Sequence, residues 1–174
     1  FRSTTMADKL IQLVGGKLTQ VEATVVSAGA GNAGEVPALD SSGKLDVSVM
    51  PTGVGPNVKV ILASDNIGAG KYVNIYDNAG TPNVRLADNS NSREAHGFVK
   101  DAVTSGNNAT VYFEGTNDDL AGLVSGARQF LAAAGGVTDT PPTFSGGAQI
   151  SQLVGVAISA TEIDTDIDDI IILA

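Results

Sequence analysis

The sequence predicts an all-β protein: a small antiparallel β-barrel or sandwich preceded by an extended N-terminal arm with a possible hairpin. After residue 57, short runs rich in Val, Ile, Thr, Tyr and Phe recur about every 8–12 residues, a spacing typical of barrels and sandwiches. Turn-forming stretches such as "DNAG", "DNSN" and "TSGNN" separate these runs. We therefore expect a hairpin and arm over residues 1–56 and a β-barrel domain over residues 57–174.

The first element, residues 9–23, reads "KLIQLVGGKLTQVEA". Gly15 and Gly16 can adopt the positive φ angles of a tight two-residue turn, which favours a β-hairpin. A helical N-terminus is the alternative. A phosphate-binding glycine loop is disfavoured, because the Lys-Thr ending and a following helix are both missing.

Residues 27–56 form the arm, in which small residues, glycines and prolines prevent long regular elements. A disordered linker is the alternative reading. Against it stands the stretch "EVPALDSSGKLDVSVMP", whose apolar residues are spaced along the chain. Ordering such a segment costs roughly 1–2 kcal/mol per residue of backbone entropy, so it must dock along an extended surface. We expect it to lie in a groove on another subunit, anchored by Val36, Leu39, Leu45, Val47 and Met50.

The barrel domain is expected to contain strands in a regular series. Alternation is visible in residues 71–77, where Val73 and Ile75 are expected on one face and Tyr72 on the other. The predicted strands are 57–64, 71–77, 83–88, 95–101, 109–115, 127–133, 136–140, 148–159 and 169–174.

Charge and composition exclude several classes of partner. The net charge of −9 and the sequence pI near 4.3 disfavour nucleic acid and anionic lipid, so neither nucleic acid nor a membrane is expected as a partner. There is no cysteine, and no apolar run approaches the ~20 residues of a membrane helix. The chain begins with Phe, and Met6 is read as the natural start in preference to a trimmed precursor.

The acidic segment "EIDTDIDD" near the C-terminus invites a comparison with cation-binding loops. A helix-loop-helix calcium loop needs Gly at its sixth position, where this sequence has Asp169. As a strand, the segment would place Ile163, Thr165 and Ile167 on the core side and its carboxylates in solvent. No metal site is therefore predicted, and Asp164, Asp166 and Asp168 are weak candidates for a surface divalent ion.

Residues for catalysis are sparse, so no enzyme activity and no cofactor are expected. The single histidine, His96, lacks the further nitrogen and sulfur ligands of a zinc site, and a structural role is expected for it. Paired carboxylates such as Glu162 with Asp164, or Asp118 with Asp119, are the residue type that glycoside hydrolysis needs, but that function is disfavoured. That reaction usually takes place in an aromatic-lined cleft, whereas this chain has eight aromatic residues and no Trp. No G-x-S-x-G elbow is present.

Two parts of the sequence carry motifs that are similar to those of known proteins. "PALDSSGKLDVSVMP" resembles the connector "P-A-L-D-x-x-G-K-L-D-x-S-x-x-P" of tailed-bacteriophage virion proteins. Downstream, "AHGFV", "ATVYFEG", "GGVTDTPP" and "QLVGVAISAT" occur in an order similar to that in phage structural β-barrels. The resemblance covers about three-quarters of the chain, and its motifs are structural ones.

The resemblance implies a capsid decoration (cement) protein, which would bind the major capsid protein and bridge neighbouring capsomers. Cement proteins of similar size are often trimeric, so self-association as a homotrimer is expected. The chain would lie on the capsid exterior of the virion after assembly in the host cytoplasm. One alternative is a tail-fibre or baseplate-tip module that binds a host receptor or glycan. A second is a small trimeric β enzyme of the nucleotide-hydrolase type, whose acidic and Gly-Ser motifs are not found in order.

Overall fold

The computed structural model describes residues 9–50 and 55–174, and the chain divides into two compact units. Phe1–Gly55 is called the N-terminal unit and Pro56–Ala174 the barrel unit. The sequence-based boundary, between residues 56 and 57, lies one residue further along. The expectation about Met6 falls outside the described residues. Within those residues, no helix has the length and apolar character needed to cross a membrane.

The N-terminal unit begins with a hairpin of β1 (Lys9–Val14) and β2 (Lys17–Glu22), which confirms the hairpin prediction over the helical alternative. Gly15 and Gly16 form its turn with φ angles of 58° and 82°, which glycine adopts at little cost. Two single-turn 3-10 helices follow, η1 (Gly29–Asn32) and η2 (Val47–Val49). The arm is therefore not extended throughout, because its backbone turns at these two points.

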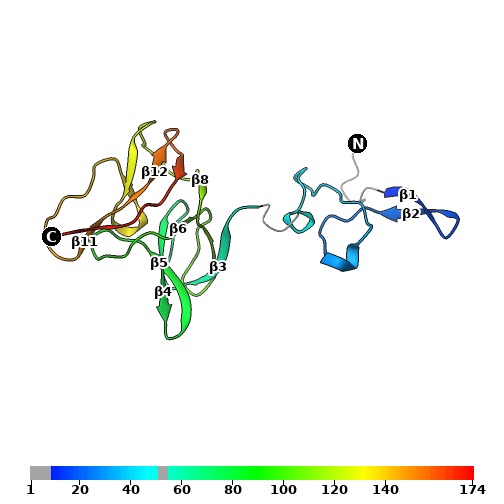
Figure 1. The fold of residues 1–174 in the computed structure, drawn as a ribbon, viewed down its shortest axis with the longest axis horizontal. Coiled ribbons are helices and arrows are strands. Elements are labelled where there is room, and N and C mark those ends of the chain that lie inside the picture. The colour runs from blue at the N-terminus through cyan, green and yellow to red at the C-terminus, as the bar shows by residue number, and fades with distance from the viewer. Residues whose placement is uncertain (1–8, 51–54) are drawn as a thin grey trace. The chain divides into compact units, whose positions relative to one another are not determined.

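Five strands of the barrel unit close into a barrel in the order β3-β5-β4-β6-β7. Four of the five pairings are antiparallel, and β3 joins β5 in parallel at Leu62 and Ala63. Figure 1 shows β4 and β5 as the long green hairpin of this barrel. The strands are β3 (Val58–Ala63), β4 (Tyr72–Asn78), β5 (Thr81–Leu86), β6 (Gly97–Val99) and β7 (Asn108–Tyr112).

A second sheet of five strands, in the order β10-β9-β12-β13-β8, completes the barrel unit together with a small sheet of β11 and β14. All of their pairings are antiparallel. The all-β prediction is thus confirmed, with a barrel and an additional sheet in one unit. The bounds are β8 (Gly115–Asn117), β9 (Arg128–Leu131), β10 (Val137–Thr138), β11 (Gln149–Ser151), β12 (Leu153–Ala157), β13 (Ile163–Thr165) and β14 (Ile171–Leu173), with a 3-10 turn η3 (Ala133–Gly135).

The barrel unit contains two hydrophobic cores. The first fills the barrel with small and β-branched side chains: Ile61, Ala63, Ile67, Val73, Val84, Val99, Ala109 and Val111. The second lies between the outer face of the barrel and the other sheets: Tyr72, Ala87, Ala95, Phe98, Leu131, Ile150 and Val154. Because full burial of a large apolar side chain gives roughly 1.5–3 kcal/mol, these two cores supply a driving force for folding.

Strands β4 and β6 separate the two cores and contribute to both. Val73 and Val99 point into the barrel, while their neighbours Tyr72 and Phe98 belong to the second core. The predicted alternation of β4 is therefore present, and both of its faces are buried at this end. Burial also raises the pKa of Tyr72, partly offset by its hydrogen bond to Thr165 Oγ1 at 3.1 Å.

Two predicted strands are each divided in the structure. Residues 109–115 split between β7, which belongs to the barrel, and β8, which belongs to the second sheet. Residues 148–159 split between β11, paired with β14, and β12, paired with β9 and β13. At Gly155 in β12, a side-chain carbon would lie 2.1 Å from the carbonyl oxygen of Asp164, so glycine permits β12 and β13 to approach closely.

The predicted alternation of buried and exposed side chains in the acidic segment is confirmed. Ile163 and Thr165 of β13 are buried, and Ile167 is half-buried beside the second core. The three intervening side chains, Asp164, Asp166 and Asp168, are exposed to solvent.

Candidate binding surface

The hairpin of the N-terminal unit exposes a large part of its apolar surface. Register places Ile11, Leu13 and Leu18 on one face, since Leu13 and Leu18 are cross-strand partners. Between 71% and 79% of each of these three residues is exposed. Lys9 and Glu22 form an exposed ion pair at the open end of the hairpin, at 3.7 Å. An isolated two-stranded hairpin is marginally stable in water, so this apolar face is suited to being covered.

The arm returns to the end of the hairpin through a short parallel bridge. The N–H of Thr24 donates to the carbonyl of Val36, and the N–H of Ala38 donates to the carbonyl of Thr24, both at 2.9 Å. Among residues 9–50, Ala38 is the only buried residue. The local fold of this unit is therefore maintained by hydrogen bonds and turns rather than by a hydrophobic core.

Carboxylates fix the turns of the arm. Asp40 Oδ1 accepts hydrogen bonds from the backbone N–H of Ser42 and of Lys44, at 2.8 and 2.9 Å. Asp46 caps η2 by accepting from the N–H of Ser48 at 2.9 Å. Hydrogen bonds from Ser42 and Ser48 accordingly hold the pKa values of Asp40 and Asp46 below their usual range. The predicted anchors Leu45 and Val47 lie next to or within these turns.

All five predicted anchors are exposed. The exposed fraction is 38% at Met50 and 68% at Val47, and the other three lie between these values. The N-terminal unit exposes five more large apolar residues that the sequence analysis did not include among the anchors: Ile11, Leu13, Val14, Leu18 and Val26. Nine others are exposed among residues 55–174, which is nearly three times as long a part of the chain as residues 9–50. The candidate binding surface is defined as the ten such residues of the N-terminal unit. Alternation within the hairpin was the signal for three of these residues, because one of its faces carries Ile11, Leu13 and Leu18.

The two units differ in charge. The barrel unit contains six Lys and Arg against fourteen Asp and Glu, a net of −8, while the N-terminal unit contains four against five, a net of −1. The weak metal candidates Asp164, Asp166 and Asp168 belong to the acidic unit. Within residues 9–50 and 55–174, no group of three or more His, Cys, Asp or Glu side chains is placed to share a metal ion. The near-neutral unit is thus the one that carries the candidate binding surface.

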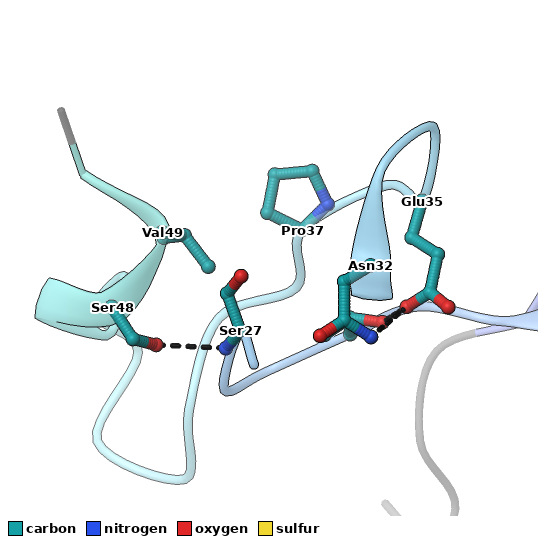
Figure 2. Close-up of a pocket in the computed structure, with 7 residues that line it drawn as sticks. Ser27, Asn32, Glu35, Pro37, Ser48 and Val49 are labelled. Atoms are coloured by element: carbon teal, nitrogen blue, oxygen red, sulfur yellow. Dashed lines mark hydrogen bonds between the residues drawn. The ribbon is translucent and has the colours of Figure 1, made fainter. Parts of the chain in front are cut away.

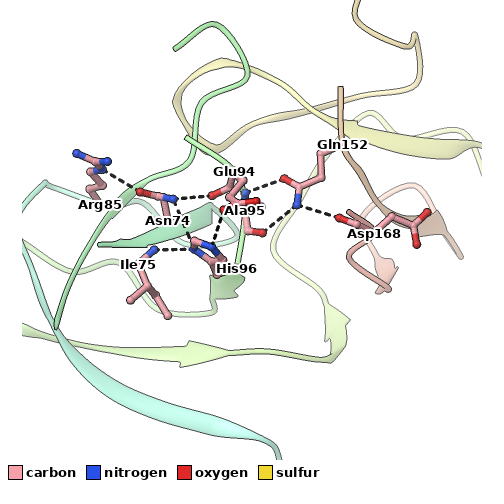
Figure 3. A network of polar contacts seen from close by, with 8 residues as sticks. All are labelled: Asn74, Ile75, Arg85, Glu94, Ala95, His96, Gln152 and Asp168. Atoms are coloured by element: carbon pink, nitrogen blue, oxygen red, sulfur yellow. Dashed lines mark hydrogen bonds and ion pairs between the residues drawn. The ribbon is translucent and has the colours of Figure 1, made fainter. Parts of the chain in front are cut away.

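His96 belongs to a structural network in the barrel unit (Figure 3). Its Nδ1 accepts a hydrogen bond from the backbone N–H of Ile75 at 2.9 Å, and its Nε2 lies 3.2 Å from Glu94 Oε1. Next to it, Gln152 accepts from the N–H of Ala95 and donates to the carbonyls of Ala95 and Asp168. The ring therefore connects β4 to the segment before β6, and it is held by the backbone N–H of Ile75 and the side chain of Glu94.

Comparisons with known proteins give no sequence match, and a weak similarity to solved structures. The sequence matches no known protein family and no curated protein. Among solved structures, the chain is similar to the crystal structure of the head fiber gp8.5 N base in bacteriophage phi29, with 15% identity and a TM-score of 0.42. The similarity covers 63% of this chain and 92% of that one. A TM-score this low does not establish a common fold, so the function is inferred below from the chain's own sequence and surface.

Proposed function

We propose that this chain is a non-enzymatic phage virion protein that decorates the head, binding the major capsid protein and bridging neighbouring capsomers. The observation that carries the proposal is the candidate binding surface, ten exposed large apolar residues in a unit with one buried residue among residues 9–50. A surface of this kind is typical of a segment that is covered by a partner. The phage connector motif lies within the same segment and supports the choice of partner.

The small binding free energy expected from one set of apolar anchors favours attachment through several copies of the chain. Covering a half-exposed Leu, Val or Met gives roughly 1 kcal/mol, about half the value for full burial, so the five predicted anchors together give about 5 kcal/mol. Association itself costs roughly 4–15 kcal/mol, and one arm alone would therefore bind weakly. When several arms are joined in one oligomer, binding of one arm to a repeating lattice raises the effective concentration of the other arms near their own sites. We therefore propose a homotrimer on the capsid exterior, with the acidic barrel unit as the folded body.

The substitutions Leu39→Asp and Leu45→Asp test the role of the anchors. Each places a charge where an apolar contact is proposed, so the affinity for phage heads, measured by sedimentation, should fall at least tenfold, which corresponds to about 1.4 kcal/mol. The heads are those assembled from the major capsid protein of the same phage genome. The melting temperature of the barrel unit should not change, because neither residue belongs to its two cores.

Val124→Asp is the matched control, since Val124 is 62% exposed and lies in the barrel unit. This variant should sediment with heads as the unaltered chain does. A lower melting temperature in the Leu39 or Leu45 variant would place that residue in a core and contradict the proposal. Binding to host cells or glycans, with none to heads, would instead support the tail-fibre or baseplate-tip alternative.

A further inference from the structure

A small pocket in the N-terminal unit is formed where the arm folds back on itself (Figure 2). Its volume is about 200 Å³. One charged side chain, four polar ones and two apolar ones line it: Glu35, Thr24, Ser27, Asn32, Ser48, Pro37 and Val49. The pocket lies directly beside the predicted anchor Val36, within the segment that is proposed to dock.

Glu35 is oriented by two donors that bind the same oxygen. Its Oε2 accepts hydrogen bonds from the Thr24 hydroxyl and, at 2.9 Å, from Asn32 Nδ2. The hydrogen bond from Thr24 and then that from Asn32 hold the pKa of Glu35 below its usual range. Among the described residues, Oε1 accepts no hydrogen bond and Glu35 takes part in no ion pair. The carboxylate is thus charged and held in one orientation, and its Oε1 is available to accept hydrogen bonds from a ligand.

The remaining polar groups of the pocket present oxygen atoms. Ser48 Oγ accepts from the N–H of Ser27 at 2.8 Å, and Asn32 Oδ1 accepts from the N–H of Ala28 at 2.6 Å. The Thr24 hydroxyl and one N–H of Asn32 are already directed to Glu35. A ligand that matches this lining therefore carries positive charge and several N–H donors.

We infer that the pocket binds an arginine side chain of the surface on which the N-terminal unit docks, an inference that rests on the proposed function. A guanidinium offers five N–H donors and no acceptor, always carries its charge, and is less strongly hydrated than an ammonium. Glu35 Oε1 accepts from it, and the serine hydroxyl oxygens provide further acceptors. Pro37 and Val49 are apolar and lie against the aliphatic part of the side chain.

The pocket should contribute only modestly to the binding affinity, because it is open to solvent. Exposed ion pairs add little affinity, so an isolated arginine should bind with a dissociation constant between about 1 and 100 mM, a range in which a titration can still be saturated. On a head, where the apolar anchors already hold the arm, the loss of the pair should weaken binding about two- to fivefold.

The test is a titration of the full-length, isotope-labelled chain followed by nuclear magnetic resonance. The probe is N-acetyl-arginine methylamide, and the control probe is the citrulline counterpart, which has a similar shape and no charge. Saturable shifts of the amide signals of Thr24, Ser27 and Asn32 with arginine alone would support the inference. Equal shifts with both probes, or no saturation with arginine, would overturn it without reliance on any variant.

Glu35→Gln removes the charge and keeps the size of the side chain, and it should abolish the saturable shifts. Glu22→Gln is the matched control, since Glu22 is an exposed glutamate of the same unit outside the pocket, and it should leave them unchanged. Shifts that persist in Glu35→Gln would overturn the inference.

The two proposals fail in different ways. Arginine binding in the pocket by a chain that does not bind heads would support this site and contradict the proposed function. Head binding that Glu35→Gln leaves unchanged would overturn the inference, while the proposed function would stand.

Discussion

A chain that lacks residues 1–55 is expected to fold, to unfold cooperatively and to lose all measurable sedimentation with phage heads. Of the eighteen buried hydrophobic residues in the described parts of the chain, seventeen lie in the barrel unit and only Ala38 lies outside it. Both hydrophobic cores thus remain intact after the deletion. The melting temperature of the barrel transition should stay within about 2 °C of its full-length value, a change worth less than ~1 kcal/mol.

Calorimetry measures the first part of this expectation and sedimentation with heads measures the second. The full-length chain is the control in both. Saturation of heads by the truncated chain, with unchanged affinity, would show that the barrel unit carries the binding surface. Loss of the cooperative transition would show that the N-terminal unit is part of the same folding unit.

Phe98→Ala is expected to lower the free energy of unfolding by about 3–5 kcal/mol, the usual cost of removing a fully buried phenylalanine. Phe98 is fully buried, and its ring centroid lies 6.0 Å from that of Tyr72 and 5.5 Å from that of Tyr112. The substitution removes these aromatic contacts and leaves a cavity between the barrel and the second sheet. Urea denaturation followed by circular dichroism measures the change.

Phe144→Ala is the control, because Phe144 is 52% exposed, and its cost should be about 0.5 kcal/mol or less. A cost below ~1 kcal/mol at Phe98 would mean that the barrel and the second sheet do not share a core. Since Phe98 belongs to a barrel strand and contributes to the second core, both sheets should be destabilised together in a single transition.

The elements specified by local signals could be predicted from the sequence. Gly15 and Gly16 indicated the hairpin, and the apolar alternation at Ile163 and Thr165 indicated which face of the acidic segment is buried. Both are confirmed because turn geometry and side-chain period depend on neighbouring residues alone. The positions of most barrel-unit strands followed from the same signals.

The pairing of strands depends on partners far along the chain and could not be predicted. Nothing local distinguishes the residues of β11, which pair with β14, from those of β12, which pair with β9 and β13. The closure of the barrel through the parallel pairing of β3 and β5 is likewise non-local. For the same reason, the burial of both faces of β4 at Tyr72 and Val73 was not foreseen.

The candidate binding surface was predictable only in part. The spacing of Leu39, Leu45 and the other anchors indicated an apolar arm, and the structure leaves all five exposed. The exposed hairpin face was not identified, because apolar residues of a predicted hairpin are normally assigned to a core. The pocket at Glu35 depends on the Thr24–Pro37 bridge, which joins residues thirteen positions apart and has no local signal.

Hydrogen exchange of the full-length chain, free and bound to heads, tests the central claim that the N-terminal unit is stabilised by a partner while the barrel unit folds alone. In the free chain, we expect rapid exchange of the amides of residues 9–50 and strong protection in β4, β6 and β7. On heads, the amides of residues 9–50 should become protected and those of the barrel unit should change little. Strong protection of residues 9–50 in the free chain, unaltered on heads, would contradict the account.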